Sequence, residues 1–188
     1  MLYPNDIAVA LKEWDCVCQA LITGRQVVML RKGGIHESGG EFEVEFRRFL
    51  LFPTFLHQDK AMIKESAHDL FKFAGCEPVK IQLAAFADIT DIVRIESDAQ
   101  IQKIADLHIW TDHFIDMRLN YRPENPLFLL LARVNALPNP ITIDNRPQYG
   151  GCKSWIGLKR TLDVSLGKPV LDAPSYQHVR DEIMLRVQ

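Results

Sequence analysis

The most apolar segment of the sequence is residues 127–134, which read Leu-Phe-Leu-Leu-Leu-Ala-Arg-Val. The segment has the length of a strand, but it lacks the alternation of apolar and polar side chains that a strand with one wet face shows. A continuous apolar run of this length is typical of a strand that is buried on both faces of a sheet. We therefore expect residues 127–134 to form a central strand.

Patterns on both sides of this segment predict further strands and helices. Apolar side chains at steps of three and four over residues 7–21 predict an amphipathic helix, and Gly24 stands where a left-handed residue would end it. Further strands are expected at residues 27–30, 41–46, 49–52, 79–83, 92–95 and 155–158, further helices at residues 59–74, 101–115 and 175–187, and turns over residues 138–149. This order lacks the regular alternation of a doubly wound fold. We therefore expect an α+β fold, with a mixed or largely antiparallel sheet and about four helices packed on it.

Length and composition agree with one domain over residues 1–188. A chain of this length buries about 70% of its unfolded surface and needs neither disulfides nor a metal to hold its core. The net charge of −2 gives no overall attraction to nucleic acids or membranes, although it leaves a local basic patch open. No apolar run approaches the roughly 18 residues of a membrane span, and the first residues do not resemble a signal peptide. We therefore expect a cytoplasmic protein without membrane contact.

A basic and glycine-rich segment follows the strand predicted at residues 27–30. Arg31 and Lys32 come directly before Gly33 and Gly34. Glycine permits a positive φ, so this turn can present backbone N–H groups beside two cations and cradle a phosphate. The spacing matches neither the P-loop nor the dinucleotide-binding fingerprint, and a hairpin turn with solvated cations is the alternative. His36 is a candidate acid or base because imidazole titrates near neutral pH.

A second polar cluster follows the strand predicted at residues 49–52. Thr54 can bond a ligand oxygen, and His57 can serve as a base or a hydrogen-bond donor. The alternative is that Pro53 and Thr54 leave the strand and that His57 helps to begin the next helix. If His36 and His57 converged on one pocket, they would form an acid–base pair of a small-molecule hydrolase or transferase.

Residues 150–155, which read Gly-Gly-Cys-Lys-Ser-Trp, form a third cluster. Lys153 can pair with a phosphate, and Trp155 can stack on a base. Arg118 is a further candidate for contact with an anion. The alternative for Trp155 is a place in the apolar core.

The sequence assigns no metal site and no cofactor. None of the six histidines belongs to a His-x-x-x-His or His-Glu-x-x-His motif, and Cys16 and Cys18 lack the Cys-x-x-Cys spacing of a zinc site. The Gly-x-Ser-x-Gly elbow of hydrolases is also missing from the sequence. We expect Cys16 and Cys18 to be buried thiols on a helix.

Several strings of the sequence resemble one family in a consistent order, from about residue 7 to about residue 183. They include Ala-Leu-Lys-Glu-Trp at residues 10–14, Leu-Arg-Lys-Gly-Gly-Ile-His-Glu at 30–37, Leu-Phe-Pro-Thr at 51–54, Tyr-Arg-Pro at 121–123 and Gly-Cys-Lys-Ser-Trp at 151–155. These strings resemble the bacterial family known as domain of unknown function 1802. The resemblance implies membership of that family, but it implies neither an activity nor a site, because none is established for it.

The leading hypothesis is a binding or processing module for a phosphate-bearing ligand, with nucleic acid or a nucleotide as the partner. Its candidate ligand-binding residues are Arg31, Lys32, Gly33, Gly34, Thr54, Arg118, Lys153 and Trp155. One alternative is the enzyme that uses His36 and His57. Another is a non-catalytic protein that binds a partner chain or forms a homo-oligomer. The sequence does not decide between an enzyme and a binding protein.

Overall fold

The computed structural model describes residues 5–32, 46–151 and 153–187. Their strands are β1 (Asp6–Trp14), β2 (Val28–Lys32), β3 (Arg48–Thr54), β4 (Lys80–Ile95), β5 (Leu127–Asp144), β6 (Trp155–Asp163) and β7 (Lys168–Pro169). They form one sheet in the order β2-β5-β4-β3-β1-β6, and β7 pairs with β5. β1 and β3 are parallel, whereas the other neighbours are antiparallel. The predicted α+β fold with a mixed sheet is therefore confirmed.

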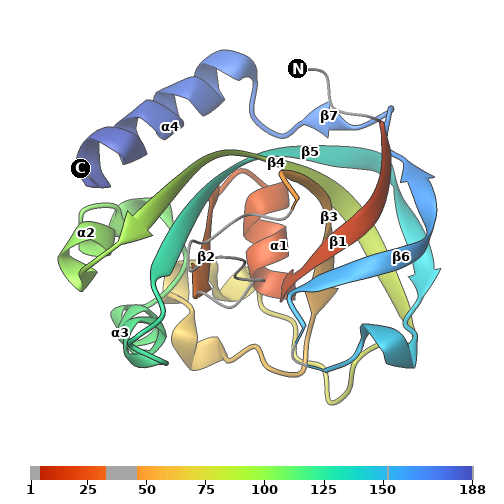
Figure 1. The fold of residues 1–188 in the computed structure, drawn as a ribbon, viewed down its shortest axis with the longest axis horizontal. Helices are drawn as coiled ribbons and strands as arrows, with labels where there is room; N and C mark the ends of the chain where they lie inside the picture. The colour runs from red at the N-terminus through yellow and green to blue at the C-terminus, as the bar shows by residue number, and fades with distance from the viewer. Residues whose placement is uncertain (1–4, 33–45, 152, 188) are drawn as a thin grey trace.

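Helices pack on this sheet at several places. The α-helices of the described residues are α1 (Asp15–Ile22), α2 (Asp98–Gln102), α3 (Asp112–Asn120) and α4 (Ala173–Val187), and the 3-10 helices are η1 (Lys60–Met62), η2 (Glu65–Leu70), η3 (Ala105–Leu107) and η4 (Pro147–Tyr149). Figure 1 shows a strongly curved sheet, with α1 near the middle of the view and α2, α3 and α4 at one side. None of the helices in the described residues is long and apolar enough to cross a membrane.

β5 confirms the predicted central strand and extends it. It lies between β2 and β4, and its side chains are buried over residues 127–132. The strand continues to Asp144, so the prediction of turns over residues 138–149 is wrong as far as residue 144. Pro138 and Pro140 fit into β5 because its pairing with β4 shifts register here, where no ladder hydrogen bond is required of them.

The helix predicted over residues 7–21 is wrong in its first half. The residues up to Trp14 form β1, which lies between β3 and β6, and α1 follows it. The apolar spacing was misleading because β1 buries side chains on both faces, as the fully buried neighbours Ala10 and Leu11 show. The predicted end of the helix is confirmed, since Gly24 has a φ of 72° just after α1.

The helices predicted over residues 59–74 and 101–115 are both interrupted. Ile63 forms an antiparallel bridge with Trp110, so the backbone at both places is extended. Backbone groups that pair across two segments cannot also continue a helix. The first segment therefore forms only η1 and η2, and the second is divided among α2, η3 and α3.

The remaining elements differ from expectation mainly in their ends. The strand predicted at residues 27–30 is confirmed as β2, and those at residues 79–83 and 92–95 are two parts of β4. The C-terminal helix begins before Ser175, whose N–H donates to Oδ1 of Asp172 at 2.8 Å. The strand predicted at residues 41–46 falls, except for its last residue, outside the described residues.

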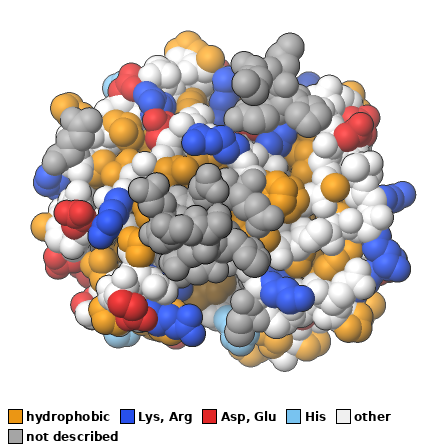
Figure 2. Space-filling model, viewed as in Figure 1, with side chains coloured by type: hydrophobic (Ala, Val, Ile, Leu, Met, Phe, Trp, Pro, Cys, Tyr) orange, Lys and Arg blue, Asp and Glu red, His pale blue; other side chains and the backbone are white. Residues whose placement is uncertain are grey.

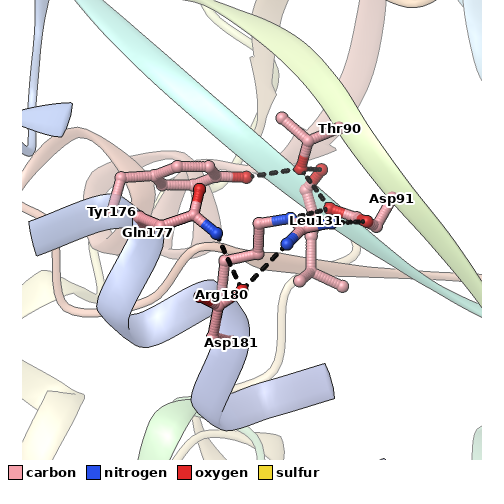
Figure 3. Close-up of polar contacts among 7 residues, drawn as sticks. All are labelled: Thr90, Asp91, Leu131, Tyr176, Gln177, Arg180 and Asp181. Atoms are coloured by element: carbon pink, nitrogen blue, oxygen red, sulfur yellow. Dashed lines mark hydrogen bonds and ion pairs between the residues drawn. The ribbon is translucent and has the colours of Figure 1, made fainter. Parts of the chain in front are cut away.

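Polar contacts fasten α4 to β4. Nε of Arg180 donates to Oδ2 of Asp91 at 2.6 Å, and the hydroxyl oxygens of Tyr176 and Thr90 lie 2.7 Å apart (Figure 3). Ile183, one helical turn further on, is fully buried in the core. The helix is thus held by a charged contact and by its apolar face together.

Two apolar clusters lie on opposite faces of β3. Phe49 and Leu51 pack in the cluster that includes α1, β2 and much of β5, whereas Leu50 and Phe52 pack in the cluster that includes β6. Successive side chains of a strand point to opposite faces, so β3 contributes to both clusters in turn.

β3 runs two residues further than expected. Pro53 and Thr54 belong to the strand, and Thr54 lies beside Trp14, the last residue of β1. Because β1 and β3 are neighbouring parallel strands, their carboxyl ends lie side by side at the same end of the sheet. This end is in the lower middle of Figure 1.

Candidate functional site

A pocket of about 660 Å³ opens at the carboxyl ends of β1 and β3. Residues of β2, of α3 and of the segment that joins β5 to β6 complete its walls. Its described lining includes the cations Lys12, Arg31, Arg118, Arg146 and Lys153, the acids Glu13 and Glu77, and the aromatic residues Trp14, Phe52, Trp110, Phe114 and Tyr149. Figure 2 shows a small hollow in the lower middle of this face, with Lys or Arg and His side chains near it.

The pocket brings together predicted site residues from separate elements. Those that line it are Arg31, Thr54, His57, Arg118 and Lys153. Two predicted residues, Lys32 and Trp155, are not part of its lining. Three others, Gly33, Gly34 and His36, fall outside the described residues, so the predicted phosphate-binding turn and the His36/His57 pair stay predictions.

Lys32 and Trp155 have contacts of their own. Nζ of Lys32 donates to the carbonyl oxygen of Leu119 at 2.7 Å, and burial, followed by the charge of Arg118, lowers the pKa of this lysine. The ring of Trp155 packs edge-on against Phe49, with ring centroids 5.0 Å apart. These contacts favour a packing role for Trp155, which was the alternative to a stacking platform.

Arg31 is held at the wall of the pocket by an ion pair with Glu13. Its Nη2 lies 2.9 Å from Oε2 of Glu13 and donates to the carbonyl oxygen of Lys12, also at 2.9 Å. The two charged side chains are only 11% and 10% exposed. Oε1 of Glu13 accepts a hydrogen bond from the N–H of Trp14 at 2.8 Å. The arginine and its acid are therefore fixed in one arrangement.

Arg118, on α3, lines the same pocket and has no acidic partner in the part of the chain that the structure describes. No carboxylate of the described residues forms an ion pair with it, and its Nε is buried without a hydrogen-bond partner. Burial, and next the charge of Arg31, lower the pKa of Arg118, while Glu13 acts in the opposite direction. Glu13 is thus paired with Arg31, and an anion bound in the pocket would be stabilised by the charge of Arg118.

Thr54, His57 and Glu77 form another part of the lining. The hydroxyl of Thr54 donates to the carbonyl oxygen of Glu13 at 3.1 Å, which leaves its lone pairs to accept from a ligand. Oε1 of Glu77 accepts from the N–H groups of Phe55 and Leu56 at 2.9 Å and 3.0 Å, whereas its Oε2 is buried without a partner. His57 is exposed at the edge of the pocket.

The apolar part of the lining is mostly aromatic. Trp14 and Phe114 have ring centroids 5.3 Å apart, and Phe114 stacks on Trp110 at 5.8 Å with an interplanar angle of 11°. Trp110 is 2% exposed and serves mainly as core, while Trp14 is half-buried. The pocket can therefore offer an aromatic surface beside its cations.

Sequence reasoning missed several residues of this pocket. Lys12 and Glu13 lie inside the string Ala-Leu-Lys-Glu-Trp that resembles the family, so that string was a usable signal. Arg146 lies in a segment that was predicted to be turns without a role. Glu77 carries no local signal, because its place in the pocket depends on contacts with residues more than 20 positions away.

Among the described residues, the cysteines and histidines show no arrangement suited to metal binding. Cys16 and Cys18 are buried on α1, as predicted, and burial, followed by the charge of Glu13, raises the pKa of Cys16 to about 12. Thiols in this state are poor nucleophiles. Within the ranges that the structure describes, no group of three or more His, Cys, Asp or Glu side chains is placed to hold a metal ion.

Among solved structures, the chain is similar to ASCH from Zymomonas mobilis. A mutant of ZmASCH matches with 13% identity and a TM-score of 0.49, covering 84% of this chain and 92% of that one. ASCH itself matches with 14% identity and a TM-score of 0.47, covering 80% and 87%. No curated protein matches the chain. The family model described as domain of unknown function (DUF1802) matches residues 10–182, and the chain therefore belongs to that family, as its sequence strings predicted.

Proposed function

We propose that this chain binds nucleic acid through the pocket at the ends of β1 and β3, with an unpaired nucleotide inside it. In this proposal Arg118 and Lys153 contact phosphate. Thr54 accepts a hydrogen bond from the ligand, and the ring of Trp14 stacks on a base. Arg31 shapes the site and adds charge, because its own guanidinium is already paired with Glu13.

The observation that carries the proposal is that Arg31 and Arg118 line the same pocket, whereas among the described residues only Arg31 forms an ion pair with an acid, Glu13. A buried cation beside another cation is unfavourable unless an anion compensates it. Arg118 has no such partner in the described chain, and its pKa is lowered by burial and by Arg31. A phosphate suits a guanidinium fork because it can accept two parallel hydrogen bonds.

The size and lining of the pocket favour a nucleotide over a bare anion. Its volume of about 660 Å³ is in the range of sites for small organic ligands, roughly 300–1,000 Å³. Inorganic phosphate would leave the aromatic wall of Trp14 and Phe114 unused. A base that leaves its stack and enters the pocket would cover that wall.

Fluorescence anisotropy with short labelled RNA and DNA at low salt tests this function. We expect Arg118→Ala and Lys153→Ala to weaken binding, and each should reduce the slope of log affinity against log salt by about 0.7. Arg94→Ala is the matched control, because Arg94 is 65% exposed and does not line the pocket. Wild-type protein that binds neither RNA nor DNA, or variants that all bind like the control, would refute the proposal.

One observation keeps the enzymatic alternative open. His57 and the unpartnered Oε2 of Glu77 belong to the lining of the same pocket. An imidazole and a carboxylate at a phosphate site are groups that general acid–base catalysis uses. If the chain processes RNA, incubation with labelled RNA should yield shorter products, and His57→Gln should abolish them while binding persists. Intact RNA after incubation with wild type would leave binding alone.

A further inference from the structure

A second hollow of about 440 Å³ adjoins the pocket. Arg146 and Tyr149 line both, so the short segment that carries η4 lies between the two hollows. The rest of the second hollow comes from the start of β4, the end of β5 and the middle of β6, with Lys80, Lys159 and Arg160 as its further cations.

Basic residues are concentrated in these two hollows. Among the described residues that line one or both, eight are Lys or Arg and three are Asp or Glu. The whole chain, in contrast, has 22 basic and 24 acidic residues. The surface formed by the two hollows is therefore positive, although the chain is slightly negative overall. It is a local basic patch of the kind that the net charge of the chain does not exclude.

The cations of the second hollow are only partly neutralised. Lys80 lies 3.5 Å from Asp144, and both side chains are about two-thirds exposed, so this pair is weak. No carboxylate of the described residues forms an ion pair with Lys159 or Arg160. Both residues are exposed.

Lys159 and Arg160 can line the same hollow because β6 is irregular there. Neighbouring side chains of a regular strand point to opposite faces. Ile7 of β1 pairs with Leu162 and Val9 pairs with Gly157, so residues 158–161 of β6 lie where the register shifts. The irregularity places two adjacent cations on one side.

The segment between the two hollows is held in place from both ends. Nδ2 of Asn145 donates to the carbonyl oxygen of Pro78 at 2.9 Å, and Nζ of Lys12 donates to the carbonyl oxygen of Gly151 at 3.1 Å. Tyr149, which is 4% exposed, packs edge-on against Phe52 at 5.9 Å. A ligand that crosses this segment therefore meets a preformed surface, which lowers the entropy cost of binding.

We propose that the ligand is a single strand of several nucleotides, which runs from the pocket past Arg146 into the second hollow. Lys159 and Arg160 contact its phosphates there. Phosphates recur along a nucleic-acid backbone, so one strand can use cations in both hollows, whereas a mononucleotide can occupy only one. This inference rests on the proposed function of the pocket and adds the length and strandedness of its ligand.

The test compares ligands of two lengths with three proteins. Anisotropy is measured for a labelled dinucleotide and for a single strand of about 12 nucleotides, a length within the site sizes of single-strand binders. The proteins are wild type, Lys159→Ala/Arg160→Ala and the control Arg94→Ala/Lys103→Ala, which loses the same charge outside both hollows. Thermal unfolding confirms that each variant is folded.

We expect wild type to bind the longer strand more tightly, and only Lys159→Ala/Arg160→Ala to lose that gain. Loss of two phosphate contacts should reduce the salt slope by about 1.4, so the advantage of wild type over the variant should shrink about sevenfold between roughly 50 and 200 mM salt. Dinucleotide binding should stay unchanged.

Two other outcomes separate this inference from the proposed function. If Arg118→Ala weakens binding but both double variants bind the longer strand equally, the second hollow is not used and only the pocket binds. If a duplex of the same length binds as well as the single strand, the inferred strandedness is wrong. If no oligonucleotide of either length binds wild type, the proposed function itself fails.

Discussion

Substitution of Glu13 with glutamine removes one negative charge from the pocket and keeps the size of the side chain. Nη2 of Arg31 lies 2.9 Å from Oε2 of Glu13, and the two side chains are 11% and 10% exposed. Breaking a buried ion pair by removing one partner costs about 3–5 kcal/mol, because the remaining charge stays buried. Arg31 keeps its hydrogen bond to Lys12, so we expect a loss of about 3 kcal/mol.

Urea and thermal unfolding measure this loss. For a chain of 188 residues, a change of 1 kcal/mol shifts the unfolding midpoint by about 2–4 °C, so Glu13→Gln should lower it by about 6–12 °C. The double variant Glu13→Gln/Arg31→Gln should recover part of the stability, because it leaves no unpaired arginine at that position. A Glu13→Gln variant within about 0.5 kcal/mol of wild type would refute the electrostatic account of this wall.

Binding should move in the opposite direction to stability. Without Glu13, the charges of Arg31 and Arg118 are no longer opposed, so Glu13→Gln should bind an oligonucleotide more tightly than wild type at low salt. The oligonucleotide should also raise the unfolding midpoint of the variant more than that of wild type. Weaker binding by a folded Glu13→Gln variant would show that Glu13 holds the site together rather than restraining it.

Three further predictions concern the stability of the fold. Arg180→Ala should lower the free energy of unfolding in urea by about 2 kcal/mol, because it removes a charged contact with Asp91, which is only 13% exposed. Gly167→Ala should cost about 1–3 kcal/mol in the same assay, since a Cβ there would overlap the ring of Phe86. Burial lowers the pKa of His108 from 6.5 to about 4, so between these pH values the unfolded chain binds a proton that the folded chain does not. Stability should therefore fall by up to about 3 kcal/mol as pH drops through that window, and His108→Phe should flatten the profile.

For each of these three variants, one result would contradict the prediction. An Arg180→Ala variant with unchanged urea midpoint would mean that the apolar face of α4 alone holds the helix. Full stability of Gly167→Ala would mean that Phe86 moves aside without cost. An equally steep loss of stability at low pH in His108→Phe would assign the pH dependence to other groups.

Sequence patterns predicted elements well where one physical constraint dominated. A buried strand was predicted at residues 127–134 because their continuous apolar run shows neither helical nor strand-like alternation. β5 confirms this prediction. The helix predicted where β1 lies was wrong for a related reason. β1 too is buried on both faces, but its polar residues at the ends of the strand left an apolar spacing that also fits a helix. The difference lies in its pairing with β3 and β6, which local sequence does not encode.

The sequence by itself determined the family, the central strand and the types of side chain that the pocket can offer. Only the tertiary structure decided which of them share the pocket. Arg31 and Lys32 are adjacent and chemically alike, yet Arg31 lines the pocket and Lys32 donates to Leu119, because neighbouring side chains of β2 point to opposite faces. The walls also depend on contacts between residues as distant in the chain as Lys12 and Gly151. Such contacts form only when the curved sheet brings its strand ends together, and no local pattern records them.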